Sequence, residues 1–163
     1  MITVYIWNFR GKNEAWGHAS MQVDNTYISW WPEKPGQIPS KIHQNIYASH
    51  PFRNRTFSAD IAGEKNHPPD HSIRIEGLNE KAIKDWWQSF GLIRDGQQFQ
   101  GPLQSWSTLI RNCSTVVATG LHIGGGDHYA SWIKSWSLIW NPNDVLQYAK
   151  SIQHGLKSKS VSK

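Results

Sequence analysis

One cysteine and one early histidine lie in sequence contexts that suit nucleophilic catalysis. Cys113 is the sole cysteine of the 163 residues and lies in NCSTVVATGL, whereas His18 lies in GHASMQV. The thiolate is the nucleophilic form of cysteine, and a helix N-terminus lowers the thiol pKa through its unpaired N–H groups and its dipole. Such a nucleophile also needs a base, and the base needs an orienting group. The two motifs therefore predict a Cys113–His18 pair that attacks a carbonyl carbon.

The helix that would carry this cysteine is indicated by the residues that follow it. Apolar or small residues recur at positions i+3, i+4, i+7 and i+8, which form one face of a helix: Val116, Val117, Gly120 and Leu121. We expect the helix to begin near Cys113, to end at glycines 124–126 and to place the thiol on its buried face. The small Gly120 would let this helix lie close to its neighbour.

The histidine begins an expected strand, and the turn after that strand decides which residues share its face. The Asp-Asn dipeptide at 24–25 suits a tight turn between two strands. With a two-residue loop, Ser29 lies diagonal to His18 on the same face of the sheet. We therefore predict that Ser29 orients the imidazole and completes the catalytic group, with Tyr27 as the second choice.

Strand-like segments come first in the chain, and helix-like segments come later. The expected strands are 2–9, 19–23 and 26–31, with short strand pieces at RTFSADI and HSIRIEG inside an irregular crossing over 33–72. Besides the helix at Cys113, we expect one capped by Asn79 and one in NPNDVLQYAKSIQHGL, capped by Asn143 or Asp144 and stopped by Gly155. The class is α+β, an antiparallel β-sheet packed against helices.

Charge and length limit the domain organisation and the partners. We expect a single domain over 1–156 and a disordered basic tail over 157–163. The net charge of +5 includes three lysines of that tail, and without them 14 basic residues face 12 acidic ones. No specific nucleic-acid partner is therefore expected. The N-terminus does not look like a Sec signal peptide, and no apolar run is long enough for a membrane span. We expect a cytoplasmic protein as synthesised, with any secretion independent of a Sec signal.

The order of these motifs resembles that of a known enzyme family. GHAS, the second strand YISWWP and the distant NCSTVVATGL are similar to the circularly permuted papain-like cysteine enzymes, which include the permuted NlpC/P60 proteins. The resemblance covers 1–31 and about 105–155, and it implies Cys113 as nucleophile and His18 as base. The acyltransferase-like branch carries NCEHF where this chain has NCSTV, which argues against that branch.

The resemblance also implies a function and a setting. It predicts a cysteine-dependent hydrolase or acyl-transfer enzyme, such as a thiol protease, amidase or deamidase. The substrate would be a peptide, a protein or peptidoglycan. Because the motifs also resemble modules of bacterial effector and toxin proteins, a cognate immunity or target protein is an expected partner.

Other chemistry finds little support in the sequence. His67 and His71 are separated by two prolines that prevent a helical turn, so we expect no metal site and no cofactor. His128 is a rival base, because it follows the cysteine by fifteen residues in GGGDHY. The three glycines of this motif are more typical of a helix end than of an anion-binding site.

The ten tryptophans allow two interpretations. Most should lie in the core, including Trp132, Trp136 and Trp140, whose spacing suits one helix face. The residues expected to bind substrate at a cleft are Trp16, Tyr27, Trp31 and Asn112, although Asn112 also suits a helix cap. The alternative function is a non-catalytic binding module that holds a partner or glycan on an aromatic surface, with the cysteine as a buried small hydrophobe.

Overall fold

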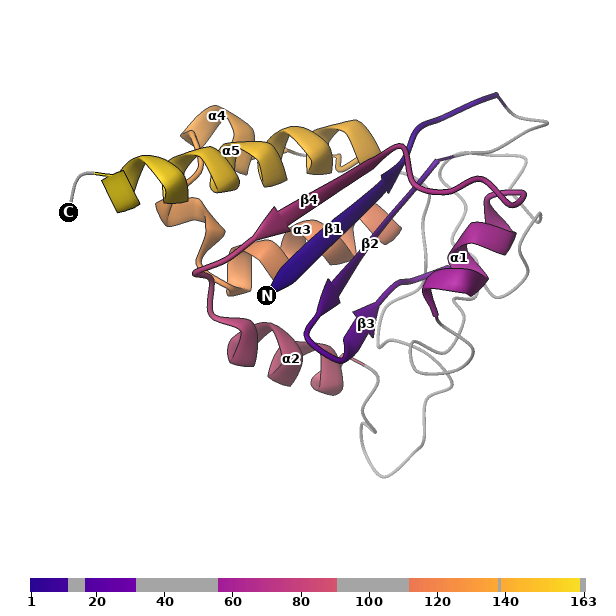
Figure 1. Cartoon of the computed structure of the whole chain (residues 1–163), viewed down its shortest axis with the longest axis horizontal. Helices are drawn as coiled ribbons and strands as arrows, with labels where there is room; N and C mark the ends of the chain where they lie inside the picture. Colours follow the sequence, from indigo (N-terminus) through magenta and orange to yellow (C-terminus); the bar gives the residue numbers. More distant parts are fainter. Residues whose placement is uncertain (12–16, 32–55, 91–111, 138, 162–163) are drawn as a thin grey trace.

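The computed structural model describes residues 1–11, 17–31, 56–90, 112–137 and 139–161. Its centre is a four-stranded antiparallel sheet with the order β3-β2-β1-β4 (Figure 1). The strands are β1 (Ile2–Trp7), β2 (His18–Val23), β3 (Thr26–Ile28) and β4 (His71–Ile75). The helices are α1 (Phe57–Gly63), α2 (Glu80–Ser89), α3 (Cys113–Ile123), α4 (Trp132–Ser135) and α5 (Pro142–Val161), with a 3₁₀ turn η1 (Gly126–His128). The expected α+β class, with helices packed on an antiparallel sheet, is confirmed.

The turn between β2 and β3 sets the predicted register. Val23 pairs with Thr26 and Met21 with Ile28, as a two-residue loop requires. Asp24 adopts a left-handed conformation with φ of 49°, which aspartate tolerates in turns. β3 is shorter than expected, because its pairing with β2 ends at Ile28.

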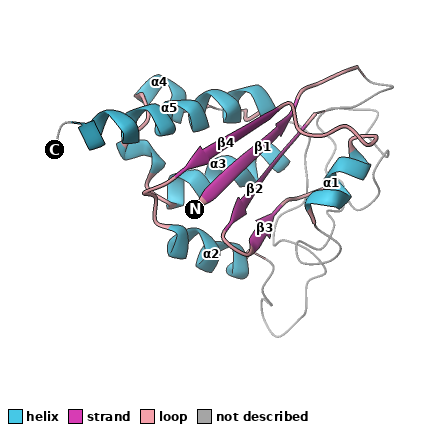
Figure 2. Cartoon of the chain, viewed as in Figure 1, coloured by secondary structure: helices cyan, strands magenta, loops and turns pink. Residues whose placement is uncertain are grey.

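One face of the sheet is apolar and is covered by α2, α3 and α5 (Figure 2). Buried residues that alternate along the strands meet buried residues of the helices there: Ile2, Val4, Ile6, Ala19, Met21, Ile83, Val117, Leu121, Tyr148 and Ile152. Asn79 caps α2 as predicted, because its side chain accepts the N–H of Ala82. Gly120 lies where any Cβ would overlap the Met21 methyl, so its lack of a side chain lets α3 approach β2.

The opposite face of the sheet carries α1, which contradicts the strand expected in RTFSADI. The alternation of apolar and polar residues in this segment resembled a strand pattern. The side chain of Thr56 accepts the N–H of Ala59, which supplies a helix cap and favours a helix instead. Phe57 of this helix packs on Tyr5 of β1, with ring centroids 4.6 Å apart.

Helix α5 begins and ends differently from the prediction. Its cap is Asn141, whose side chain accepts the N–H of Asp144 at 3.0 Å, rather than Asn143 or Asp144. Gly155 does not stop the helix, which continues to Val161 and so includes most of the segment expected to be a disordered tail. A Cβ at Gly155 would overlap the Tyr129 carbonyl, so this glycine is explained by close packing rather than by termination.

The tryptophans after η1 also depart from the prediction. Trp132 and Trp136 are largely exposed rather than buried in the core, whereas Trp140 packs against it. The reason is that α4 has only four residues and Trp136 is already extended, with φ of −125° and ψ of 120°. The three rings therefore do not share one helix face. Among the helices of the described segments, none combines the length and the apolar character needed to cross a membrane.

Candidate active site

His18 is the centre of a buried polar network at the start of β2. Its ring is 1% exposed, and its Nε2 lies 3.0 Å from Asp60 Oδ2 and 3.0 Å from Ser29 Oγ. Ser29 is the predicted partner and lies where the register places it. Asp60, which lies on α1, is the stronger partner because it is a carboxylate and is itself fully buried.

Asp60 is held by four donors, which leaves neither of its oxygens unpaired. Oδ2 accepts from His18 and, at 2.7 Å, from the Tyr27 hydroxyl. Oδ1 accepts from Ser29 at 3.0 Å and from the Trp31 indole N–H at 2.7 Å. Because each partner is a donor, the network fixes the carboxylate in its ionised form.

The charges of His18 and Asp60 stabilise each other. Burial alone would lower the pKa of His18, but the charge of Asp60, then that of Cys113, and hydrogen bonds with both raise it to about 10. Burial would raise the pKa of Asp60, but the charge of His18 and the hydrogen bonds from His18, Tyr27 and Ser29 lower it to about 2. The structure therefore favours an imidazolium beside a carboxylate at neutral pH.

Cys113 is the first residue of α3, as the sequence predicted. Asn112 is the N-cap: its side chain accepts the N–H of Thr115 at 3.0 Å, and the Thr115 side chain accepts the Asn112 N–H. The Asn112 amide also donates to the Trp140 carbonyl at 3.0 Å. These contacts fix the first turn of the helix, so the role that the structure gives Asn112 is that of a cap. The cysteine side chain is only partly buried.

The charges of the Cys113 thiol and the His18 imidazole act on each other. Burial would raise the pKa of Cys113, but the charge of His18 and hydrogen bonds with His18, the Ala19 backbone and Ser114 lower it below its ordinary value. Since Nε2 of His18 is taken by Asp60 and Ser29, Nδ1 is the nitrogen left for the thiol. The site therefore combines a thiol, an imidazole and a carboxylate in Cys113, His18 and Asp60.

Aromatic rings enclose the imidazole. Trp31 stacks on His18 with ring centroids 4.3 Å apart and an interplanar angle of 24°, and Trp7 lies 5.5 Å away. A Cβ at Gly63 would sit 3.2 Å from the Trp31 ring, so this glycine leaves room for the indole against α1. An aromatic face stabilises a neighbouring cation and limits rotation of the ring. Trp31 therefore helps to hold the imidazole of His18 in position.

Not all of the residues predicted for this site lie beside His18 in the described structure. The structure brings together His18, Cys113, Ser29, Tyr27 and Trp31, whereas Trp16 lies outside the described residues. His128, the rival base, lies in η1 beyond the C-terminal end of α3, at the other end of that helix from the thiol. Sequence reasoning missed Asp60. The available signal was an acidic residue four positions after Thr56, a cap residue, in an otherwise small and apolar segment.

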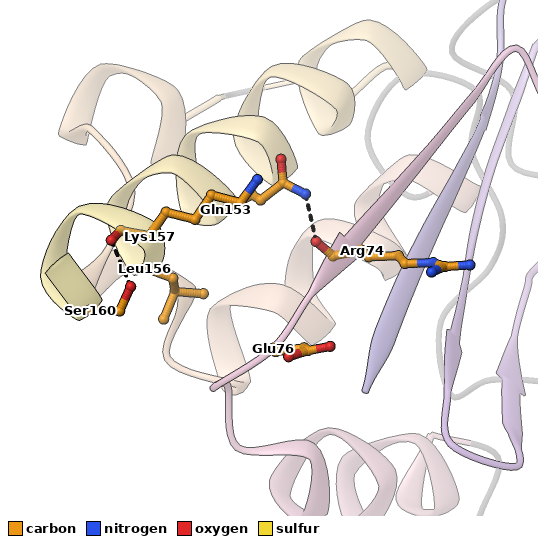
Figure 3. A pocket seen from close by; sticks show the side chains of 6 residues that line it. All are labelled: Arg74, Glu76, Gln153, Leu156, Lys157 and Ser160. Carbon is orange, nitrogen blue, oxygen red and sulfur yellow. Dashed lines mark hydrogen bonds between the residues drawn. The ribbon is translucent and has the colours of Figure 1, made fainter.

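A separate hollow lies between β4 and the C-terminal half of α5, and β1 separates β4 from β2 in the sheet (Figure 3). Its volume is about 530 Å³, and it is lined by Arg74, Glu76, Gln153, Leu156, Lys157 and Ser160. The Gln153 amide donates to the Arg74 carbonyl at 2.7 Å, which covers part of the edge of β4 (Figure 3). Its polar side chains do not converge on one point, so we assign it no chemistry. Within the described residues, no three His, Cys, Asp or Glu side chains gather as metal ligands.

Comparison with known families adds an independent observation. Residues 52–163 match the model of the IcsB middle domain. The chain belongs to the IcsB middle domain family. The part that matches this IcsB domain includes Asp60 and Cys113, whereas His18 precedes it. No curated protein and no solved structure matches the chain.

Proposed function

We propose that this member of the IcsB middle domain family is a cysteine-dependent hydrolase or acyl-transfer enzyme. The observation that carries the proposal is the buried His18, which pairs with the carboxylate of Asp60 and whose charge lowers the pKa of Cys113. Such an arrangement activates a thiol at neutral pH and has no evident need for structure alone, because a buried ion pair contributes little net stability. The permuted papain-like architecture remains part of this proposal and rests on the order of the histidine and cysteine motifs.

The reaction follows from the charges of the resting site. The Cys113 thiolate attacks the carbonyl carbon of an amide or thioester, and an S–C bond forms. Backbone N–H groups of the first turn of α3 stabilise the oxyanion. His18 gives its Nδ1 proton to the leaving nitrogen or sulfur, whose bond to carbon breaks. Asp60 stays ionised and holds the imidazole.

The second half of the reaction regenerates the site. Water, or an acceptor amine in acyl transfer, gives a proton to His18 and attacks the thioester carbon. The S–C bond breaks and restores the thiolate beside the imidazolium. Both halves need the same groups, so the structure supports hydrolysis and acyl transfer equally. The match to a family related to bacterial effectors favours a protein or peptide substrate in that setting.

The test uses the single thiol of the chain. Iodoacetamide modification of the folded protein, measured against pH, reports on Cys113 alone. We expect a reactive pKa well below the free-thiol value of about 8.5, shifted upward in His18→Ala and unchanged in His71→Ala. His71 is a matched control because it also begins a strand but lies on β4. Cys113→Ser should abolish labelling.

A second measurement separates an enzyme from a binding module. With p-nitrophenyl acetate, an enzyme should release a burst of nitrophenolate equal to the protein and carry one acetyl group on Cys113. The burst should vanish in Cys113→Ser and in His18→Ala. Labelling that appears only after unfolding, alike in the wild type and in His18→Ala, would contradict the proposal and favour a non-catalytic binding module.

A further inference from the structure

The segment around α4 presents an apolar surface to solvent. Its members are Trp132, Ile133, Trp136 and Ile139, and we call them the Trp132 surface. Trp132 is 79% exposed and Trp136 is 73% exposed. A folded protein rarely leaves two neighbouring indoles in water, because tryptophan is highly buried on average. Exposed apolar surface of this kind usually marks a site of interaction.

The segment that carries the Trp132 surface is fixed to α5 and to the core. The N–H of Ser131, just before α4, donates to Ser151 Oγ on α5 at 2.8 Å. Tyr129 and Trp140, on either side of the segment, pack against the core. Figure 1 shows α4 lying beside α5, away from α1 and the start of β2. The exposed side chains therefore belong to an anchored segment rather than to a frayed end.

Lysines lie within this surface and on the neighbouring helix α5. Lys134 lies within α4, next to the exposed apolar residues. On α5, Lys150 precedes the serine that anchors α4, and Lys159 lies 3.1 Å from the His128 carbonyl and 4.5 Å above the Tyr129 ring. All three lysines are exposed, and none takes part in an ion pair within the described residues.

Lysines outnumber the acidic residues in this part of the chain, since residues 127–161 contain four lysines and only two acidic residues, Asp127 and Asp144. Asp127 already contacts His122 at 2.7 Å and the Tyr148 hydroxyl at 2.6 Å. Asp144 is held by Asn141 at 2.6 Å, and no acidic residue follows it in the sequence. The surroundings of the Trp132 surface are thus complementary to an anionic layer.

We propose that the Trp132 surface docks on a membrane of anionic phospholipid. Indoles prefer the boundary between headgroups and acyl chains, where the ring is apolar and its N–H is hydrated. Lysines beside them attract anionic headgroups. This surface is a binding feature separate from the Cys113 site, and it does not depend on the proposed reaction.

The arrangement of the exposed residues favours a lipid surface over a protein groove. A helix that docks in a protein groove presents a stripe at i, i+3, i+4 and i+7 over several turns. Here Trp132 and Ile133 are consecutive, and so point about 100° apart on a single helical turn, and a lysine follows directly. Apolar side chains that spread from one turn, with a cation among them, suit a soft interface that has no fixed shape.

The experiment is cosedimentation of the wild-type chain with vesicles. One set contains phosphatidylcholine alone, and the other contains phosphatidylcholine and phosphatidylserine in about a 3:1 ratio. We expect binding to the second set that weakens as salt is raised. Trp132→Ser and Trp136→Ser should each weaken binding about tenfold, and Lys134→Gln about fivefold. Cys113→Ser should bind as the wild type does.

Matched variants control for the loss of any exposed aromatic or lysine. Phe9→Ser and Lys81→Gln change exposed residues after β1 and on α2, and both should leave vesicle binding unchanged. Circular dichroism should show the same fold for all variants. Absence of binding to the anionic vesicles, equal binding to both vesicle sets, or binding unaffected by Trp132→Ser with Trp136→Ser would overturn the proposal. A dimer in solution that these tryptophan variants dissociate would also overturn it and assign the surface to a second copy of the chain.

Discussion

Replacing Asp60 by asparagine should damage both the stability of the chain and the reactivity of its thiol. The carboxylate accepts from four donors, two on each oxygen. An asparagine side chain turns one of these oxygens into an NH₂ group, so two donors then face a donor. A pKa of Asp60 lowered from 3.8 to about 2 corresponds to roughly 2 kcal/mol of favourable interaction. With the unpaired donors added, we expect Asp60→Asn to cost about 3–5 kcal/mol.

The effect on Cys113 follows from the loss of the carboxylate charge. Without it, burial of the imidazole is opposed by fewer favourable contacts, so the pKa of His18 falls and less imidazolium remains beside the thiol. The pKa of Cys113 then rises. Below that pKa, each unit of rise lowers the thiolate fraction about tenfold.

Two assays measure these effects in the same variants. Urea unfolding gives the free energy, and iodoacetamide labelling against pH gives the reactive pKa of Cys113. Asp85→Asn is the matched control, because Asp85 lies on the surface of α2 in an i, i+4 pair with Lys81 and should cost no more than about 0.5 kcal/mol. If Asp60→Asn behaves like Asp85→Asn in both assays, the carboxylate does not hold the base and the reasoning is wrong.

Three further predictions test the packing, the pH dependence and the ring beside the base. Gly155→Ala should destabilise the fold by about 1–3 kcal/mol in urea unfolding, because the added methyl would overlap the Tyr129 carbonyl. This loss should occur even though alanine favours helices. A gain in stability would refute the packing argument. The stabilisation from His18 is complete below pH 6.5 and is lost as pH rises through about 10, whereas that from Asp60 is complete above pH 3.8 and is lost as pH falls through about 2. The lowered pKa of Cys113 adds stabilisation that is complete above about pH 9 and is lost as pH falls through the folded value, so it offsets part of the loss from His18. The urea midpoint should therefore fall below pH 3.8 and again above about pH 9, and a midpoint that is unchanged in both ranges would contradict the pKa shifts. Trp31→Phe keeps a ring over the imidazole but removes the indole N–H that Asp60 accepts, so it should lower the free energy of unfolding by about 2 kcal/mol. Iodoacetamide should still label Cys113 below the free-thiol pKa. Labelling only at the free-thiol pKa would show that the indole N–H is essential.

The parts of the site that the sequence predicted are those specified by local patterns. The register of β2 and β3 follows from a two-residue turn, and it places Ser29 beside His18. The start of α3 follows from Asn112 as a cap and from the apolar residues after Cys113. Such patterns depend on neighbours within a few residues, so sequence reading can find them.

The parts that were missed depend on contacts between distant segments. Asp60 is 42 residues from His18, and nothing near it in the chain shows that it will be buried. Gly155 looks like a helix stop until Tyr129 is seen against it. Trp132 and Trp136 have helical spacing, but the chain leaves the helix between them. In each case tertiary packing, rather than local preference, decides the outcome.

The proposed nucleophile, base and orienting carboxylate lie on α3, β2 and α1, which are far apart along the chain. Contacts of such long sequence separation form only after the sheet and its helices have come together, because the loops that join them must close first. A partly folded chain would therefore carry an ordinary, weakly reactive thiol. Rapid labelling of Cys113 at low pH should appear only with the last stage of folding, which makes this thiol a direct kinetic reporter of the native state.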